Sequence, residues 1–333
     1  MLILGVETSC DETAAAVVRD GHEIHSNIIL SQEIHSRYGG VVPELASRIH
    51  ITELVGIVDK ALLSANVNLN DLDGLAVTHG PGLVGCLLVG LSFVKSVSMA
   101  KKIPYWGVNH LEGHIFAARL EHKALKTPHI ALVVSGGHSS LYLVEDWGRY
   151  RQLGSTRDDA AGEAFDKVAK LLELGYPGGP VIEKAAESGD KSFIKFPRAM
   201  KDHDNFEFSF SGLKTAVSLY VRDNDSRFIA DHREDIAASF QEAVVDILAQ
   251  KALGAARKHG INQIAITGGV ARNKRLKERF REIAKDKQEI FFPAPILCTD
   301  NGAMIAACGD FYLSRGEKAD MRLDAVPYLE LGI

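Results

Sequence analysis

The chain opens with a pattern of apolar and polar residues that predicts a β-hairpin. Residues 1–8 (MLILGVET) are mostly apolar, residues 9–12 form a polar turn, and residues 13–18 are apolar again before Asp20-Gly21. Short apolar runs bounded by turn residues are typical of strands. We therefore expect two strands joined by an acidic, hydroxyl-rich loop.

The same pattern returns near residue 129. The segment HIALVVSGG predicts a strand that ends in the turn Gly136-Gly137-His138. The next segment, SSLYLVED, predicts a second strand that closes at Trp147-Gly148. The pattern of the chain thus restarts at about this point.

A pair of longer segments indicates a duplication. Residues 73–85 and 262–273 each predict a strand, a glycine-rich turn and a long helix, and the two helices lead to the strands PYWGV and EIFFP. Such units, occurring twice, predict an α/β protein of two related lobes facing a cleft. We place the lobes at residues 1–128 and 129–333, with the C-terminal helix packing back on the first lobe. Chance similarity among α/β units is the alternative.

The glycine turns have two interpretations. A turn such as Gly268-Gly269 can bring backbone N–H groups against the phosphate of a nucleotide at a helix N-terminus. It is also simply the way in which a strand turns into a helix. The sequence alone leaves both open.

Composition predicts an ordinary globular protein of the cytoplasm. The chain has 333 residues with 46% hydrophobic content, enough for a large core. Its first dozen residues lack the pattern of a secretory signal, and the apolar run Leu83–Val94 is too short to span a membrane. The four cysteines form no CxxC pair, as expected for reduced thiols. A formal net charge of -5 neither supports nor excludes binding to RNA.

One short motif is a metal candidate. In NHLEGH, His110 and His114 are four residues apart at the start of a helical stretch, so their side chains lie on one face. Two imidazoles and a carboxylate would hold a first-row metal with open positions, but the spacing does not locate the carboxylate. Surface or capping histidines are the alternative. A zinc-protease HExxH motif is absent, because Glu112 is two residues after His110.

Taken together, six collinear blocks between residue 1 and about residue 310 carry a resemblance to a known family. The chain resembles the universal threonylcarbamoyl transferases, the TsaD proteins of bacteria and their KEOPS-complex relatives, and more closely the bacterial and organellar branch. Departures are Ser139-Ser140, where many members have Thr-Gln, and residues 218–234, which match little. The blocks are ETSCDETAAAV, SRYGGVVPELASR, THGPGLVGCLLVG with NHLEGH, LVVSGGHSSL, DDAAGEAFDKVAKLLELGYPGGP with FSFSGLKTAV, and TGGVARN with CTDNGAMIA.

The resemblance implies a fold and a set of site residues. The fold is that of the actin, heat-shock ATPase and sugar-kinase superfamily, with two duplicated RNase H-like lobes and a nucleotide cleft. Asp300 completes the metal site with His110 and His114, and the divalent metal is iron or zinc, with Fe(II) preferred. The residues implied for the nucleotide pocket are Val133, Val134, Ser135, Gly136, Gly137, Asp166, Gly179, Glu183 and Asn273. From the pattern alone, the favoured interpretation of Asp166 is a solvated position on an amphipathic helix.

The resemblance also implies a reaction. The donor is threonylcarbamoyl-AMP, made by a threonylcarbamoyl-AMP synthase, and ATP, ADP or AMP can occupy the same cleft. The acceptor is the N6 amine of the adenosine 3′-adjacent to the anticodon, in tRNAs that read codons starting with adenine, and AMP is released. We expect Asp11 or Glu12 to act as the base, the alternative being an ordinary acidic turn. TsaB and TsaE type proteins are the implied partners, with no membrane involved.

Other functions stay open on the residues alone. The basic helix after Asn273, with Lys274, Arg275, Lys277, Arg279 and Arg281, is either a tRNA contact or a solvated face. An ATPase or sugar kinase would use the same fold, although such enzymes hold magnesium through oxygen ligands rather than imidazoles. A nucleotide-dependent scaffold is the rival from another class, and a zinc endopeptidase lacks its glutamate.

Overall fold

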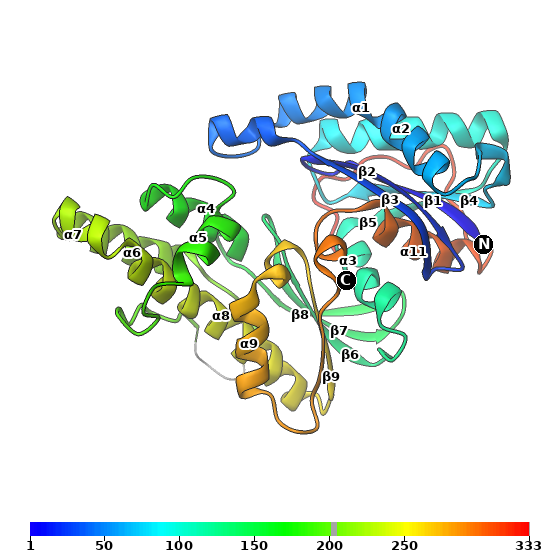
Figure 1. The fold of residues 1–333 in the computed structure, drawn as a ribbon. Helices are drawn as coiled ribbons and strands as arrows, with labels where there is room; N and C mark the ends of the chain where they lie inside the picture. The colour runs from blue at the N-terminus through cyan, green and yellow to red at the C-terminus, as the bar shows by residue number, and fades with distance from the viewer. Residues whose placement is uncertain (201–204, 333) are drawn as a thin grey trace. The chain divides into compact units, whose positions relative to one another are not determined.

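The computed structural model describes residues 1–200 and 205–332 and divides the chain into two compact units (Figure 1). Unit 1 consists of Met1–Ala124 and Ile296–Leu331, and unit 2 contains Leu125–Pro295. The chain therefore enters unit 2 at Leu125 and returns to unit 1 at Ile296. We had placed a single boundary between residues 128 and 129.

Unit 1 is built on a mixed five-stranded sheet with the order β3-β2-β1-β4-β5. Strand β1 pairs antiparallel with β2 and parallel with β4. The elements are β1 (Leu2–Glu7), β2 (Glu12–Arg19), β3 (Glu23–Ser31), η1 (Glu33–Tyr38), α1 (Pro43–Ser64), η2 (Leu69–Asp71), β4 (Gly74–Gly80), α2 (Val84–Lys101), β5 (Tyr105–Asn109), α3 (His110–Glu121), α10 (Pro295–Cys298) and α11 (Gly302–Leu313).

Helices cover both faces of this sheet. Helices α1 and α2 pack on one face and share with it a core of aliphatic side chains, and α3 and α11 pack on the other face. Helix α11 lies directly on strand β1, because a Cβ atom on Gly5 would come within 2.2 Å of the Gly302 carbonyl oxygen. Only glycine allows this approach. The C-terminal segment is thereby fixed against the first strand of the chain.

Unit 2 repeats the sheet with the order β10-β9-β6-β7-β8. Helix α8 packs on β6 and β9, and α5, α6 and α9 pack on α8. The elements are β6 (His129–Val134), β7 (Ser139–Asp146), β8 (Arg149–Ser155), α4 (Ala161–Leu171), α5 (Gly178–Ala186), α6 (Ser211–Asp223), α7 (Ser226–Asp231), α8 (Arg233–Lys258), β9 (Gln263–Thr267), η3 (Gly269–Arg272), α9 (Lys274–Ile283) and β10 (Glu289–Phe291).

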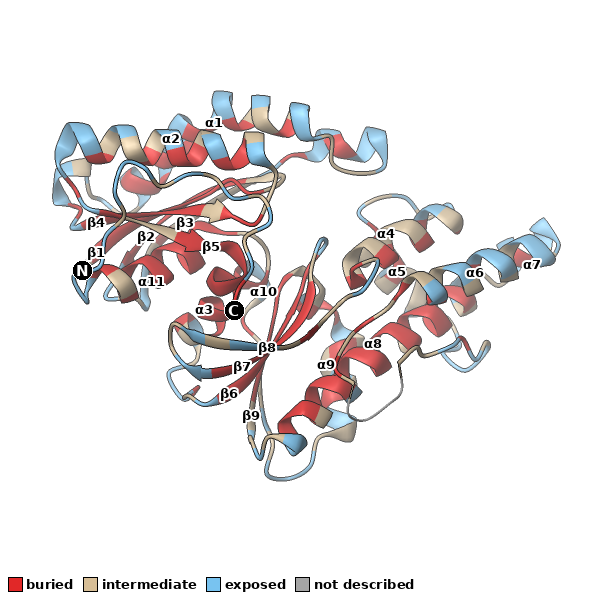
Figure 2. Cartoon of the chain, turned by 180° about the vertical axis from the view of Figure 1, so that it is seen from behind, coloured by how far each residue is buried: buried red, intermediate tan, exposed pale blue. Residues whose placement is uncertain are grey.

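The two sheets confirm the predicted α/β duplication. In each, an antiparallel pair joins two parallel strands in the same spatial order, with β6 in the place of β1 and β9 in the place of β4. Each predicted hairpin is extended by a third strand, β3 or β8, that the pattern did not predict. The central strands are buried, whereas only one residue of β8 is buried (Figure 2).

Helix α2 is long and apolar enough, by length and composition alone, to cross a membrane, and a third of that stretch is buried. The core helix of a folded unit passes the same test. Here α2 packs against β4 and α1 through Cys86, Leu87, Leu91 and Val94, which are all buried. Its place in the layer therefore favours the interpretation as a core helix.

Candidate metal centre and nucleotide residues

The two histidines lie at the start of helix α3, directly after strand β5. Asn109 caps this helix, since its side-chain oxygen accepts hydrogen bonds from the backbone N–H groups of Leu111 and Glu112 at 2.9 and 3.4 Å. The cap fixes where the helix begins. His110 and His114 consequently lie one turn apart, with ring centroids separated by 4.7 Å.

Asp300 completes the cluster and comes from the C-terminal segment of unit 1, Ile296–Leu331. Its Oδ1 atom lies 3.6 Å from Nε2 of His110 and 3.2 Å from Nε2 of His114. One ligand atom from each of the three residues fits within 4.8 Å of the others, close enough to share one ion. The structure thus brings together the three residues implied as metal ligands, and the same Nε2 atom of each ring faces the carboxylate.

Local contacts explain how Asp300 reaches this position. The neighbouring Asn301 caps helix α11 by accepting from the Met304 N–H at 3.0 Å, and its amide donates to the Thr299 carbonyl at 2.7 Å. Helix α11 packs against Gly5 of strand β1. Asp300, which directly precedes the capping residue Asn301, therefore lies near the end of that strand. The carboxylate that sequence spacing could not locate comes from this packing.

The chemistry of the cluster suits a cation. His114 is fully buried; its Nδ1 atom has no hydrogen-bond partner among the described residues, and its Nε2 atom faces the Asp300 carboxylate at 3.2 Å without forming a hydrogen bond. A buried polar atom of this kind is costly unless something binds it. Burial opposes charge on His110, but the carboxylates of Asp300 and Glu7 outweigh it and raise the pKa of His110 to about 9. The site is therefore rich in negative charge that a divalent cation would balance.

Glu112 plays no part in this cluster. It accepts a hydrogen bond from the hydroxyl of Tyr312 at 2.6 Å, on the opposite side of α3. The general base of a zinc protease would have to face the metal. The geometry thus agrees with the sequence in excluding that class of enzyme.

The acidic turn lies close to the same cluster. Burial, followed by the nearby carboxylates of Asp300 and Asp11, raises the pKa of Glu12 well above its usual range. The turn is held in place from outside: the Asp11 carbonyl accepts from the Gln32 N–H at 3.1 Å, and His50 contacts the Cys10 carbonyl and the Thr13 hydroxyl at 2.9 and 2.8 Å. Asp11 and Glu12 are therefore rigidly placed residues of unit 1.

The residues implied for nucleotide binding all lie in unit 2. Val133 and Val134 are fully buried in strand β6, so any contact from them comes through the backbone. Ser135 closes the turn by pairing with His138 through backbone and side chain. Gly136 and Gly137 are exposed, and a Cβ atom on either would meet nothing within 4 Å. The space beside these two glycines is therefore open.

The polar members of the set each hold the start of a helix. Asp166 accepts from the N–H of Gly178, the first residue of α5, at 2.7 Å, and Glu183 accepts from the N–H of Lys274, the first residue of α9, at 2.6 Å. Asn273 caps α9 and donates to Gln241 at 2.7 Å. These contacts give each residue a structural role of its own. A Cβ atom on Gly179 would meet nothing within 4 Å, so the space beside this glycine is open.

The turn at Gly268 is explained by geometry. This residue has a φ of 90°, and a Cβ atom on it would lie 2.3 Å from the Val134 carbonyl oxygen. Glycine is thus required here whether or not a ligand binds. A Cβ atom on the neighbouring Gly269 would meet nothing within 4 Å.

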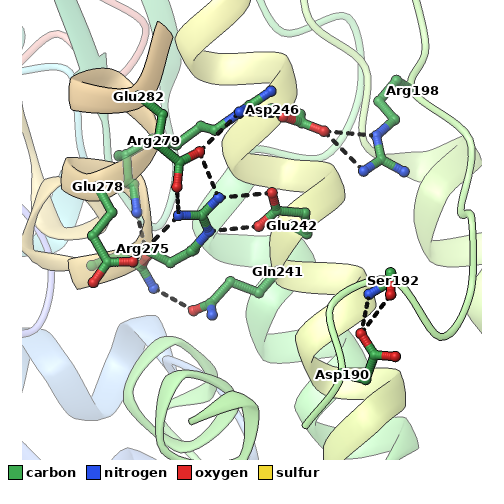
Figure 3. A network of polar contacts seen from close by, with 12 residues as sticks. Asp190, Ser192, Arg198, Gln241, Glu242, Asp246, Arg275, Glu278, Arg279 and Glu282 are labelled. Carbon is green, nitrogen blue, oxygen red and sulfur yellow. Dashed lines mark hydrogen bonds and ion pairs between the residues drawn. The ribbon is translucent and has the colours of Figure 1, made fainter.

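Basic residues of helix α9 are engaged in ion pairs (Figure 3). Arg275 contacts Glu242 at 2.6 and 2.9 Å and Glu282 at 2.6 and 3.0 Å, and Arg279 contacts Asp246 at 2.6 Å. Helix α8, which supplies Glu242 and Asp246, was not predicted. Its carboxylates pair with two of the five basic residues that the sequence shows on α9, Arg275 and Arg279.

Sequence reasoning also missed the groups behind His110. Glu7 and Thr78 lie in apolar strands and are fully buried, and Ser9 is 2% exposed. The available signal was a single carboxylate inside the run LILGVE. We had predicted that run only as an apolar strand.

Solved structures define the class of fold. HypF from T. kodakarensis superimposes with a TM-score of 0.65 at 16% identity, over 94% of this chain and 48% of that one. Component A of (R)-2-hydroxyglutaryl-CoA dehydratase from Acidaminococcus fermentans gives 0.57 at 16% identity, over 94% and 99%. The chain thus shares its fold with these two proteins.

Sequence comparison then gives the family. Residues 23–307 match the family TsaD, tRNA N6-adenosine threonylcarbamoyltransferase. Proteins of that name from Syntrophus aciditrophicus and Syntrophotalea carbinolica are 51% and 53% identical to this chain, over 98% of it in both cases and over 96% and 95% of their own lengths. The chain belongs to this family, as the sequence blocks had implied.

Proposed function

We propose that this chain, a tRNA N6-adenosine threonylcarbamoyltransferase by family, works with a transition metal held by His110, His114 and Asp300. The convergence of two buried Nε2 atoms on one carboxylate carries this proposal. Imidazole and carboxylate ligands suit iron or zinc, and we propose Fe(II) as the native ion. When bound, the ion would act as a Lewis acid toward a carbonyl oxygen or would orient the group being transferred.

The proposed reaction is an acyl transfer. The N6 amine of the adenosine 3′-adjacent to the anticodon attacks the carbamoyl carbonyl carbon of threonylcarbamoyl-AMP, in tRNAs that read codons starting with adenine. An N–C bond forms, the C–O bond to the phosphate breaks, and AMP leaves with the electron pair. The amine loses one proton, which a residue of the enzyme accepts.

We propose Asp11 or Glu12 for that proton. Burial and the neighbouring carboxylates raise the pKa of Glu12, which favours its protonated form over the ionised form that a base needs. Positive charge beside Asp300 would lower the pKa of Glu12 again. The proposed metal and the proposed base therefore depend on each other. Single-turnover transfer by Glu12→Gln and Asp11→Asn, with the donor bound normally, tests this assignment.

We further propose that unit 2 binds the nucleotide part of the donor. The open space at Gly136, Gly137 and Gly179 supports close approach of a ligand to the backbone, and carboxylates such as Asp166 and Glu183 suit ribose hydroxyls. ATP, ADP or AMP would compete for the same residues. Asn273 and the strand end Val133–Ser135 complete the proposal. Binding of AMP to the purified chain, compared with Gly137→Val, tests it.

The proposed setting is the cytoplasm, with tRNA as acceptor and proteins of the TsaB and TsaE type as partners. A threonylcarbamoyl-AMP synthase would supply the donor. The deciding experiment is single-turnover transfer of labelled threonylcarbamoyl from its AMP ester to unmodified tRNA, with partners present, for wild type and His110→Ala. Product from wild type and its loss in a folded variant is the expected result. An unaffected variant would refute the role of the metal site.

A further inference from the structure

Glu7 is a buried carboxylate for which the proposed reaction has no direct use. It ends the apolar strand β1, and its side chain is fully buried. Ionised groups in such surroundings are costly unless they are paired and hydrogen-bonded. Glu7 meets both conditions, because the Ser9 N–H donates to Oε1 at 2.6 Å and the Thr78 hydroxyl donates to Oε2 at 2.5 Å.

The remaining contact of Glu7 is with a proposed metal ligand. Nδ1 of His110 lies 3.2 Å from Oε2 of Glu7 and 3.2 Å from the Ser9 hydroxyl. An ionised carboxylate only accepts hydrogen bonds, so the ring nitrogen that faces it carries the proton. In a neutral imidazole the lone pair is then on the other nitrogen, Nε2. That is the atom that faces Asp300.

We propose that Glu7 is a positioning residue, which fixes the ring of His110 and leaves its Nε2 lone pair directed at the metal. This inference rests on the proposed metal site and adds a residue behind it. Carboxylates that hold the far nitrogen of a metal-binding histidine act in this way in many metalloproteins, and their loss typically weakens metal binding 10- to 100-fold.

The hydrogen-bond pattern predicts what a glutamine would do at this position. The backbone N–H of Ser9 can only donate, so the amide oxygen of Gln must stay at the place of Oε1. The NH2 group then occupies the place of Oε2, where the Thr78 hydroxyl can turn to accept from it. Nδ1 of His110 then faces a donor in place of the carboxylate that accepted its proton, which favours the tautomer with the proton on Nε2. Glu7→Gln thus preserves the shape of the side chain and removes the carboxylate that holds the Nδ1 proton of His110.

The test is a metal titration that needs no transfer activity. The full chain, freed of metal, is titrated with Co²⁺, whose absorption bands report the number of ligands, and affinity is measured against a competing chelator. We expect Glu7→Gln to bind Co²⁺ about 10- to 100-fold more weakly. Asp73→Asn is the matched control, because Asp73 accepts from the Leu2 N–H at 2.7 Å at the other end of β1. We expect its Co²⁺ affinity to equal that of wild type.

Each outcome decides something. If folded Glu7→Gln binds Co²⁺ with unchanged affinity, the inference is overturned and the metal site is unaffected. The same holds if Asp73→Asn loses as much Co²⁺ affinity as Glu7→Gln. If wild type itself fails to bind Co²⁺, the metal site falls and the inference with it. Should Glu7→Gln fail to fold, Thr78→Val decides: it removes one hydrogen bond to Glu7, and we expect weaker Co²⁺ binding, so unchanged affinity would overturn the inference.

Discussion

The ion pairs between α8 and α9 allow a quantitative prediction about the stability of unit 2. Arg275 and Glu242 are each 12% exposed, and the two groups make two contacts of 2.6 and 2.9 Å. Removing one partner of a buried pair leaves the other charge without compensation, which costs about 3–5 kcal/mol in fully buried cases. Here the exposed fraction and the nearby Arg279 lessen the cost. We expect Arg275→Met to lower the free energy of unfolding by about 2–3 kcal/mol.

The measurement can be confined to unit 2. The chain has two tryptophans, of which Trp106 lies in unit 1 and Trp147 in unit 2. In a Trp106→Phe background, fluorescence during urea unfolding reports only the surroundings of Trp147. Arg149→Met is the control, since Arg149 pairs with Glu145 at the surface of the same unit with 74% and 39% of the two side chains exposed. We expect this control to change stability by less than about 0.5 kcal/mol.

A double-mutant cycle completes the design. Replacing both partners, as in Arg275→Met with Glu242→Leu, removes the uncompensated charge, so we expect a coupling energy of at least about 1 kcal/mol. Unchanged stability in Arg275→Met would refute the reasoning. If the same variant instead weakened tRNA binding and reduced its salt dependence, Arg275 would be an RNA contact.

Three further predictions concern other parts of the molecule. Burial lowers the pKa of His129 to about 4, below its unfolded value of about 6.5. As the pH drops, the unfolded chain therefore binds a proton at His129 before the folded chain does. The free energy of unfolding should fall between about pH 6.5 and about pH 4, by about 3 kcal/mol in total. In urea titrations His129→Gln should flatten this dependence, and an unchanged slope would contradict it. Gly268→Ala should cost more than about 2 kcal/mol and Gly269→Ala less than about 1 kcal/mol, so comparable losses in urea unfolding would contradict the turn geometry. A metal at about 100 times its Kd should stabilise wild type by about 2.7 kcal/mol and leave His114→Ala unchanged; equal thermal shifts would exclude His114 as a ligand.

Much of the fold was predictable because its central strands are short apolar runs. Strands β1, β2, β6 and β7 were expected within a residue or two, and the repeated strand-turn-helix units gave the duplication. Strand β8, with the sequence RYRQLGS, was missed because an exposed outer strand has no continuous apolar run. The segment that became α7 and the start of α8 was left without a structure.

The candidate site was predictable to a different degree. The spacing of His110 and His114 indicates a shared helix face, but Asp300 is distant in sequence, and only the family resemblance implied it. Glu7 was missed because its neighbours in the strand are apolar, and because two of its partners, Thr78 on β4 and His110 on α3, are distant in sequence. Pairing across a sheet is set by register, which a single sequence does not display.

The return of the chain to unit 1 at Ile296 has a consequence for biosynthesis. The histidines are made early, whereas Asp300 and α11 follow only after the whole of Leu125–Pro295 has been translated. At about 5–20 residues per second, the ribosome needs roughly 10–30 s for that stretch. During this time strand β1 lacks the helix that packs on Gly5. A nascent chain therefore acquires the complete ligand set only after all of Leu125–Pro295 has been made.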